Sequence, residues 1–251
     1  GMQRDYWYDT ARNANDFVPA GTIGRQTAER TVARLGARKL STRETPVLFV
    51  PEVARSLIGH FLSGVSGGAL YRRASFLVDH AGKRVFPEWM QIAERPHIPR
   101  GHGSTAFDSE GVATRDSDLV TDGVLQRYIL GSYSARKLGL TSTGNAGGVH
   151  NVVVQPGSED FAALVKRMGR GLVVTELMGQ GVSLVTGDYS RGASGYWVEN
   201  GVIQYPVEEV TIAGNMREMF QQIVGIGNDV LARGSKSTGS ILIEKMVVAG
   251  N

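Results

Sequence analysis

The segment from Gly171 to Asn215 limits the possible folds of this chain more than any other part of the sequence. It is rich in β-branched residues, aromatic residues and glycine, and it shows almost no helical periodicity. Near its middle, Asn200-Gly201 separates two apolar runs. Asn-Gly favours a tight type I′ turn, because both central residues of that turn need positive φ. We therefore expect a β-hairpin across Ser194–Val207 that turns at Asn200-Gly201.

Apolar patterns elsewhere are typical of further strands and a few helices. Short apolar or alternating runs predict strands at Met2–Thr10, Pro46–Val50 and Ile241–Val248. Helical spacing and capping residues predict helices at Gln26–Leu35, at Pro51–Val65, at Glu159–Met168 with Ser158 as its cap, and after a cap at Asn215.

Turn signals connect these elements. Asp122-Gly123 indicates a second hairpin, and the proline-containing stretch Ala81–Gly103 is expected to be a long surface loop. Strands outnumber helices, and hairpins join most of the strands. We therefore expect an α+β fold, β-rich, with a mostly antiparallel or mixed sheet and a few covering helices.

Composition excludes several classes of partner and chemistry. The 251 residues include no cysteine, which excludes disulfides, thiolate nucleophiles and thiolate zinc ligands and fits a cytoplasmic location. The net charge is only +3, and the basic residues are scattered rather than interleaved with aromatics, so we expect no nucleic-acid partner. No apolar run approaches the ~20 residues that cross a bilayer, so we expect no membrane partner.

Several motifs follow one another in the order found in a known family. They are RKLST at Arg38–Thr42, FDSEGV at Phe107–Val112, SYSARKLG at Ser132–Gly139, STGNAGGVHN at Ser142–Asn151, LMGQGVS at Leu177–Ser183, TGDYSRGASGYWVENGVIQYPVEE at Thr186–Glu209 and GNDV at Gly227–Val230. Together they resemble the TldD/PmbA family, on its PmbA (TldE) branch. The resemblance covers nearly the whole chain. It implies that residues 1–251 form a barrel-like C-terminal domain, with residues 1–24 as the end of a connection from an upstream domain.

The resemblance also implies peptidase machinery in which a zinc-dependent, TldD-like member is paired with a PmbA-like member. In the catalytic members, the helix corresponding to Pro51–Val65 carries His-Glu-x-x-x-His, which can hold zinc and supply a base. Here His60 is the only histidine of that helix, and no glutamate follows it. Thr238 stands where the family has a cysteine ligand. We therefore expect no catalytic or metal-binding residue in this chain, and zinc in the partner subunit.

The family's two-subunit architecture implies a role in shaping a shared chamber that admits unfolded peptides. Candidate chamber residues are Asn145, His150, Glu176 and Tyr189. Candidate contacts with a TldD-like partner, or with a second copy in a homodimer, are His60, Ser63 and Gly64.

Other interpretations stay open at this point. The glycine-rich stretches at Ser142–Asn151 and Met178–Ser183 are either tight turns or edges that add a peptide strand. The family label "modulator of DNA gyrase" suggests a protein-binding modulator without peptidase activity. An independent serine hydrolase would use Ser66, in a Gly-x-Ser-x-Gly pattern, or Ser134, in a Ser-x-x-Lys pattern. His97 and His102 would hold a metal only with a further ligand nearby.

Overall fold

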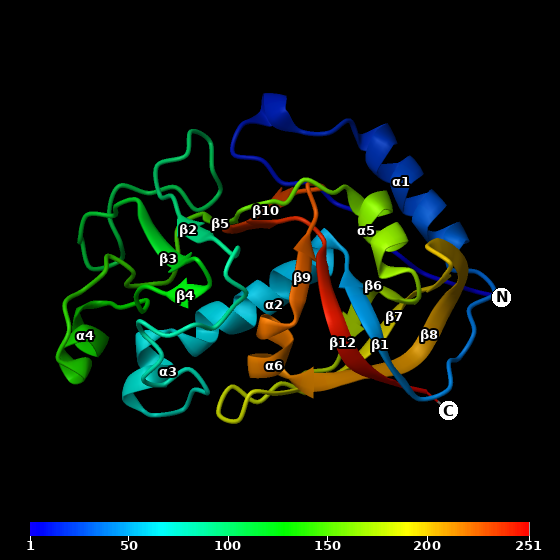
Figure 1. Cartoon of the computed structure of the whole chain (residues 1–251). Coiled ribbons are helices and arrows are strands. Elements are labelled where there is room, and N and C mark those ends of the chain that lie inside the picture. Colours follow the sequence, from blue (N-terminus) through cyan, green and yellow to red (C-terminus); the bar gives the residue numbers. More distant parts are fainter. Residues whose placement is uncertain (251) are drawn as a thin grey trace.

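The computed structural model describes residues 1–250 as two six-stranded sheets with six α-helices and a short 3-10 helix, η1 (Figure 1). In chain order the elements are η1 (Ala14–Asp16), α1 (Ala20–Ala33), β1 (Arg43–Phe49), α2 (Pro51–Gly64), α3 (Gly67–Tyr71), β2 (Ile92–Glu94), β3 (Ser117–Thr121), β4 (Val124–Leu125), α4 (Ser132–Leu138), β5 (Val152–Val154), α5 (Phe161–Met168), β6 (Gly171–Met178), β7 (Asp188–Glu199), β8 (Val202–Asn215), α6 (Met216–Gln221), β9 (Ile223–Ile226), β10 (Leu231–Arg233), β11 (Lys236–Thr238) and β12 (Ile241–Ala249). None of the described helices is long and apolar enough to cross a bilayer.

The first sheet closes into a five-stranded barrel. Its strand order is β1-β6-β7-β8-β12, and β12 pairs back onto β1, while β9 extends the sheet from β12. All of these pairings are antiparallel except that of β1 with β6. The expected α+β class and the barrel-like, mostly antiparallel sheet are therefore confirmed.

Side chains alternate between the two faces of the barrel wall, as a period of two requires. On β1, Val47 and Phe49 belong to the main core, whereas Leu48 points outward into a second apolar cluster. Helix α5 covers that cluster with Leu164 and Val165. One helix therefore buries the outer face of β1, β6 and β7, and the rest of the apolar wall faces the common core.

The second sheet, with the order β10-β11-β5-β2-β3-β4, lies beside the barrel. Helix α2 contacts β1 and β6 of the barrel and β11 of the second sheet, so it lies between the two (Figure 1). Pro51 occupies the first turn of α2, where its missing N–H costs nothing. The expected apolar face of this helix is buried, with Leu57, Ile58 and Phe61 almost fully inaccessible.

The expected central hairpin is confirmed. Strands β7 and β8 pair antiparallel, and the turn falls at Asn200-Gly201. Both residues have positive φ, +53° and +71°, as a type I′ turn requires. The second expected hairpin is also present, with Asp122-Gly123 joining β3 to β4.

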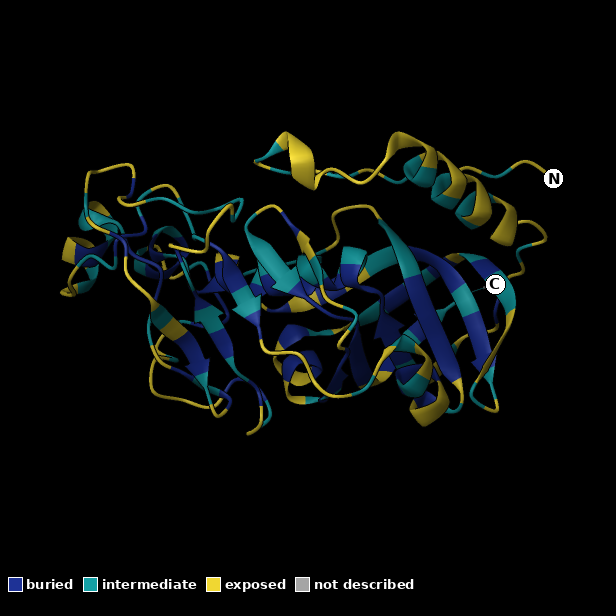
Figure 2. Cartoon of the chain, turned by 90° about the horizontal axis from the view of Figure 1, so that it is seen from above, coloured by how far each residue is buried: buried dark blue, intermediate teal, exposed yellow. Residues whose placement is uncertain are grey.

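Several expected elements differ near the N-terminus. The strand predicted at Met2–Thr10 was wrong, since these residues form no strand, and their aromatic side chains contact arginines instead. Helix α1 begins at Ala20, before the expected start at Gln26, and none of its residues is buried. Figure 2 shows it on the outside of the molecule, so its apolar spacing does not mark a core face.

Two smaller predictions also need correction. The cap of α5 is Asp160, whose carboxylate accepts a hydrogen bond from the Ala163 amide, and not Ser158. The stretch Ala81–Gly103 is mostly loop but contains β2, whose short apolar run is interrupted by a bulge. The cap at Asn215 is confirmed, because its side chain accepts from the Arg217 amide.

Candidate functional site

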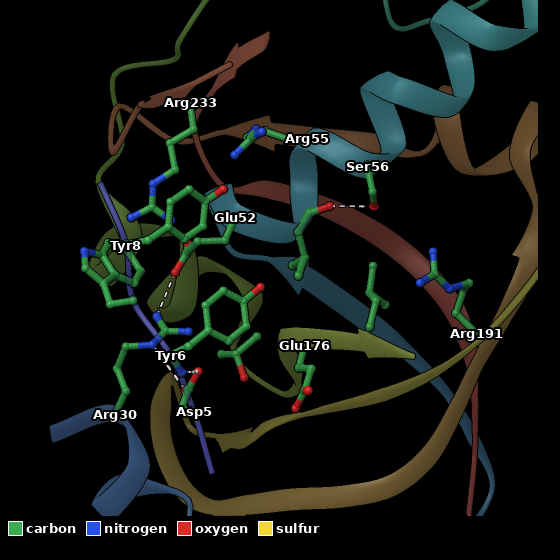
Figure 3. Close-up of a pocket in the computed structure, with 14 residues that line it drawn as sticks. Asp5, Tyr6, Tyr8, Arg30, Glu52, Arg55, Ser56, Glu176, Arg191 and Arg233 are labelled. Atoms are coloured by element: carbon green, nitrogen blue, oxygen red, sulfur yellow. Dashed lines mark hydrogen bonds and ion pairs between the residues drawn. The ribbon is translucent and has the colours of Figure 1, made fainter. Parts of the chain in front are cut away.

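A cleft lies where α2, the end of β6 and the N-terminal segment meet. It encloses about 210 Å³, and it is lined by Asp5, Tyr6, Trp7, Tyr8, Arg30, Glu52, Val53, Arg55, Ser56, Thr175, Glu176, Leu177, Arg191 and Arg233 (Figure 3). Strand β1 pairs with β6 only at Leu172–Val174, so the last residues of β6 pair with β7 alone. The cleft therefore borders a stretch of strand with an unpaired edge, a feature that can receive an extended peptide.

The carboxylates of the cleft are all held by two arginines, Arg30 of α1 and Arg34, which caps the C-terminus of that helix. Arg30 binds Asp5 at 3.2 Å and Glu52 at 2.7 Å, measured from nitrogen to oxygen. Arg34 binds Glu176 at 2.5 Å and lies 3.9 Å from Asp5. Glu176, a predicted chamber residue, therefore lines the cleft, but its charge is already neutralised within the chain.

Aromatic residues of the N-terminal segment clamp one further arginine. The Arg233 guanidinium lies 4.1 Å from the ring centre of Trp7 and 4.2 Å from that of Tyr8. The Arg30 guanidinium also lies over the Trp7 ring, 4.9 Å from its centre. Such cation–π contacts are each worth about 0.5–2 kcal/mol. They explain how a segment without strand hydrogen bonds stays against the cleft.

Tyr189 and His60 meet next to this cleft. Tyr189, a predicted chamber residue, is 1% exposed, and its ring lies edge-on to the His60 ring with centres 6.0 Å apart. Neither the Tyr189 hydroxyl nor His60 Nε2 has a hydrogen-bond partner. Burial raises the pKa of Tyr189 well above its ordinary value. The phenol is therefore neutral, and it does not act as a base at neutral pH.

His60 gives a pH-dependent stability prediction. Burial lowers the pKa of His60 below 6.5, and the charges of Arg191 and Lys236 lower it further. As pH falls through about 6.5, the unfolded chain gains a proton that the folded chain still refuses, so stability decreases. We expect the melting temperature to fall less between pH 7 and pH 5 in His60→Gln than in the wild type. The same substitution at His102, whose ring bonds the Thr10 carbonyl, is the control. Equal slopes for His60→Gln and the wild type would contradict the prediction.

The other two predicted chamber residues, Asn145 and His150, lie together at the second sheet, apart from the cleft lining. Both bind Glu94 at the end of β2: the Asn145 amide donates at 2.8 Å, and the His150 backbone N–H donates at 2.6 Å. Glu94 is 2% exposed and also binds the Arg127 guanidinium. The structure thus places Asn145 and His150 in a buried polar network that holds the glycine-rich loop before β5.

The predicted partner-contact residues lie at the C-terminal half of α2. Ser63 is exposed and His60 is half-buried, but Gly64 is buried against Phe76 and Leu77 of its own chain. Of the three, only Ser63 is exposed in this chain.

The residues of the rival chemistries make ordinary structural bonds. The Ser66 hydroxyl donates to the Ser63 carbonyl, and that of Ser134 donates to the Gly131 carbonyl. His97 bonds the Thr114 hydroxyl. Neither serine is bonded to a group that would act as its base.

The zinc that the resemblance implies for catalytic members does not fit the residues of α2. This helix lines the cleft with Glu52, Val53, Arg55 and Ser56 and carries His60 further along, and Glu52 is held by Arg30. Thr238 is fully buried on β11 and donates its hydroxyl to the Gly239 carbonyl. Within residues 1–250, no three His, Cys, Asp or Glu side chains come together in a way that could hold a metal ion.

Sequence reasoning missed the arginines of the cleft. Arg55, Arg191 and Arg233 come from α2, β7 and β10, so no local motif joins them. The consecutive aromatics Tyr6, Trp7 and Tyr8 were a visible signal, but they suggested a strand and not the stacking of Trp7 and Tyr8 on Arg233.

Comparison with known proteins places this architecture in a family. Residues 42–250 match the model of the PmbA/TldA metallopeptidase C-terminal domain. The chain is 52% identical over 249 residues to Metalloprotease PmbA of Escherichia coli O157:H7, covering 99% of this chain and 55% of that protein. The chain therefore spans about half the length of the curated relatives it matches.

Two solved structures have the same fold. A Thermotoga maritima protein, described as a proposed modulator of a DNA gyrase, superposes with a TM-score of 0.90 at 35% identity, covering 97% of this chain and 58% of that one. TldE from Thermococcus kodakarensis gives a TM-score of 0.81 at 24% identity, covering 92% of this chain and 55% of that one, and supports the fold alone.

Proposed function

The chain belongs to the TldD/PmbA metallopeptidase family, on its PmbA branch, and from this premise we propose that it is part of a non-catalytic subunit of a heterodimeric zinc peptidase. The observation that carries the proposal is the chemistry of α2. Where catalytic members are expected to place two zinc-binding histidines and a glutamate, this helix presents Arg55, Ser56 and a single histidine, His60. Cations repel a metal ion instead of binding it.

In this proposal the subunit shapes a chamber, and a TldD-like partner supplies the zinc. The cleft beside α2, with the unpaired edge of β6 and the aromatic segment Tyr6–Tyr8, suits an extended, unfolded peptide better than a folded surface. A cytoplasmic location is part of the proposal and is consistent with the absence of cysteine.

Reconstitution tests this proposal. We expect the chain alone, or its full-length form, to leave an unfolded fluorescent casein substrate intact. The full-length form mixed with a TldD-like partner should cleave it, EDTA should stop cleavage, and added zinc should restore it. Partner alone is the control. Cleavage by this chain alone that resists EDTA and is lost in Ser66→Ala or Ser134→Ala would favour a serine hydrolase instead.

A protein-binding modulator without peptidase activity is the second candidate, because the Thermotoga maritima relative is described as a proposed modulator of a DNA gyrase. The scattered basic residues of this chain favour protein contact over DNA contact for such a role. Reconstituted pairs that never cleave peptides would favour this alternative.

A further inference from the structure

Four cations converge beside α2 with no carboxylate to neutralise them. They are Arg55 on α2, Arg191 on β7, Arg233 on β10 and Lys236 on β11. The carboxylates of the cleft are bound by Arg30 and Arg34, and no ion pair within residues 1–250 includes any of these four cations. The region therefore carries an excess of positive charge that the chain itself does not balance.

Contacts between α2 and the β10–β11 turn bring Arg55, Arg233 and Lys236 together, and Arg191 lines the same cleft as Arg55 and Arg233. The Lys236 amine lies 3.5 Å from the position a side chain at Gly59 would take, and an Arg55 guanidinium nitrogen lies 3.8 Å from the corresponding position at Gly234. Burial lowers the pKa of Lys236, and the neighbouring Arg55 lowers it further. In Figure 3, Arg55 and Arg233 enter at the top of the cleft, and Arg191 lies at its right-hand end.

The same region contains buried donors with nothing to bind. Arg233 is only 5% exposed, and its Nε has no hydrogen-bond partner. Nε of Arg55 and the Tyr189 hydroxyl are likewise buried and without a partner. Buried charged donors are costly unless an acceptor compensates them. A group that brings oxygen acceptors and negative charge would satisfy the site.

The size and lining of the cleft select the kind of anion. A volume of about 210 Å³ admits the end of a peptide or one acidic side chain, and it is too small for a long polyanion such as a nucleic acid. Arginine binds carboxylates with paired, charge-assisted hydrogen bonds. We propose that Arg55, Arg191, Arg233 and Lys236 form a binding site for a peptide carboxylate, at the chain's C-terminus or on an acidic side chain.

The peptide nature of the ligand rests on the proposed function, but the site can be tested separately by direct binding. The probes are acetyl-trialanine with a free C-terminal carboxylate, acetyl-aspartate-alanine amide, acetyl-trialanine amide and inorganic phosphate, titrated calorimetrically into this chain at low salt. We expect one or both carboxylate peptides to bind at least about tenfold more tightly than the neutral amide, as loss of a charge-assisted hydrogen bond predicts. The tighter of the two identifies the source of the carboxylate.

Matched variants show whether the named cations form the site. Arg55→Gln and Arg191→Gln should each weaken carboxylate binding about tenfold, whereas Arg136→Gln, at an exposed arginine of α4, should leave it unchanged. Equal binding of acid and amide, binding of phosphate alone, no binding at all, or unchanged affinity in both cleft variants would overturn the proposal. If carboxylate binding fails, the reconstituted pair can still show chelator-sensitive cleavage. If that cleavage fails, this chain can still bind carboxylate peptides.

A stability measurement keeps the test independent of ligand choice. Because the four cations repel one another in the free chain, Lys236→Met should raise the melting temperature, by about 2–4 °C for a chain of this size. Lys137→Met on α4 is the control, and it should not raise it. A lower melting temperature for Lys236→Met would show that the chain already compensates this charge, and would contradict an open anion site.

Discussion

Gly195→Ala is expected to destabilise the protein by about 3 kcal/mol or more. Gly195 lies on β7 opposite Val174 of β6, and a Cβ at this position would lie 1.8 Å from the Val173 carbonyl oxygen. The clash is with backbone, so no side-chain rotation can relieve it. Urea unfolding monitored by tryptophan fluorescence would measure the loss.

Gly192→Ala on the same strand is the matched control. A Cβ there would lie 3.3 Å from the Met178 Cβ and 3.7 Å from its carbonyl oxygen, so a shift of a few tenths of an ångström suffices, unlike the 1.8 Å clash at Gly195. We expect a change below about 1 kcal/mol. Similar losses for the two alanine variants would show that strand glycine content, rather than the close approach of β6 to β7, sets the effect.

Glu94→Gln should cost about 3–5 kcal/mol, because it leaves Arg127 partly buried without its counter-charge. The Glu94 carboxylate also accepts hydrogen bonds from the side chain of Asn145 and the backbone of His150. Its loss should therefore loosen the glycine-rich loop before β5, and hydrogen exchange at His150 and Asn151 should accelerate.

Glu88→Gln removes a comparable partner from an exposed pair. Glu88 lies 3.9 Å from Arg84 and its side chain is 83% exposed, so the expected change is within about 1 kcal/mol. A loss for Glu94→Gln as small as that for Glu88→Gln would mean that the buried network contributes no more than a surface ion pair.

The sequence predicted those parts of the fold that depend on local chemistry. The Asn200-Gly201 turn, the Pro51 helix start and the Asn215 cap each follow from the preferences of one or two residues, and all three are present. The closed barrel followed from the family resemblance. Closure itself depends on β12 pairing with both β1 and β8, and these strands are far apart in sequence.

The candidate site was harder to predict because its parts come from separate elements. Asn145 and His150, predicted to line a chamber with Glu176 and Tyr189, bind the buried Glu94 and lie at the second sheet, away from the cleft, so their chamber role stays a prediction. The segment Met2–Thr10 alternates like a strand, yet its rings are satisfied by Arg30 and Arg233, whose positions only the folded chain determines. Residue patterns report local preference and cannot show such distant pairings.

The central claim is that the zinc of the active pair lies in the partner and that α2 of this chain holds none. Native mass spectrometry of the reconstituted, cleaving complex and of each separated subunit tests it most directly. We expect one zinc in the complex, that zinc retained by the TldD-like subunit, and none bound by the full-length form of this chain at equimolar zinc. One zinc per copy of this chain, lost in His60→Ala, would contradict it.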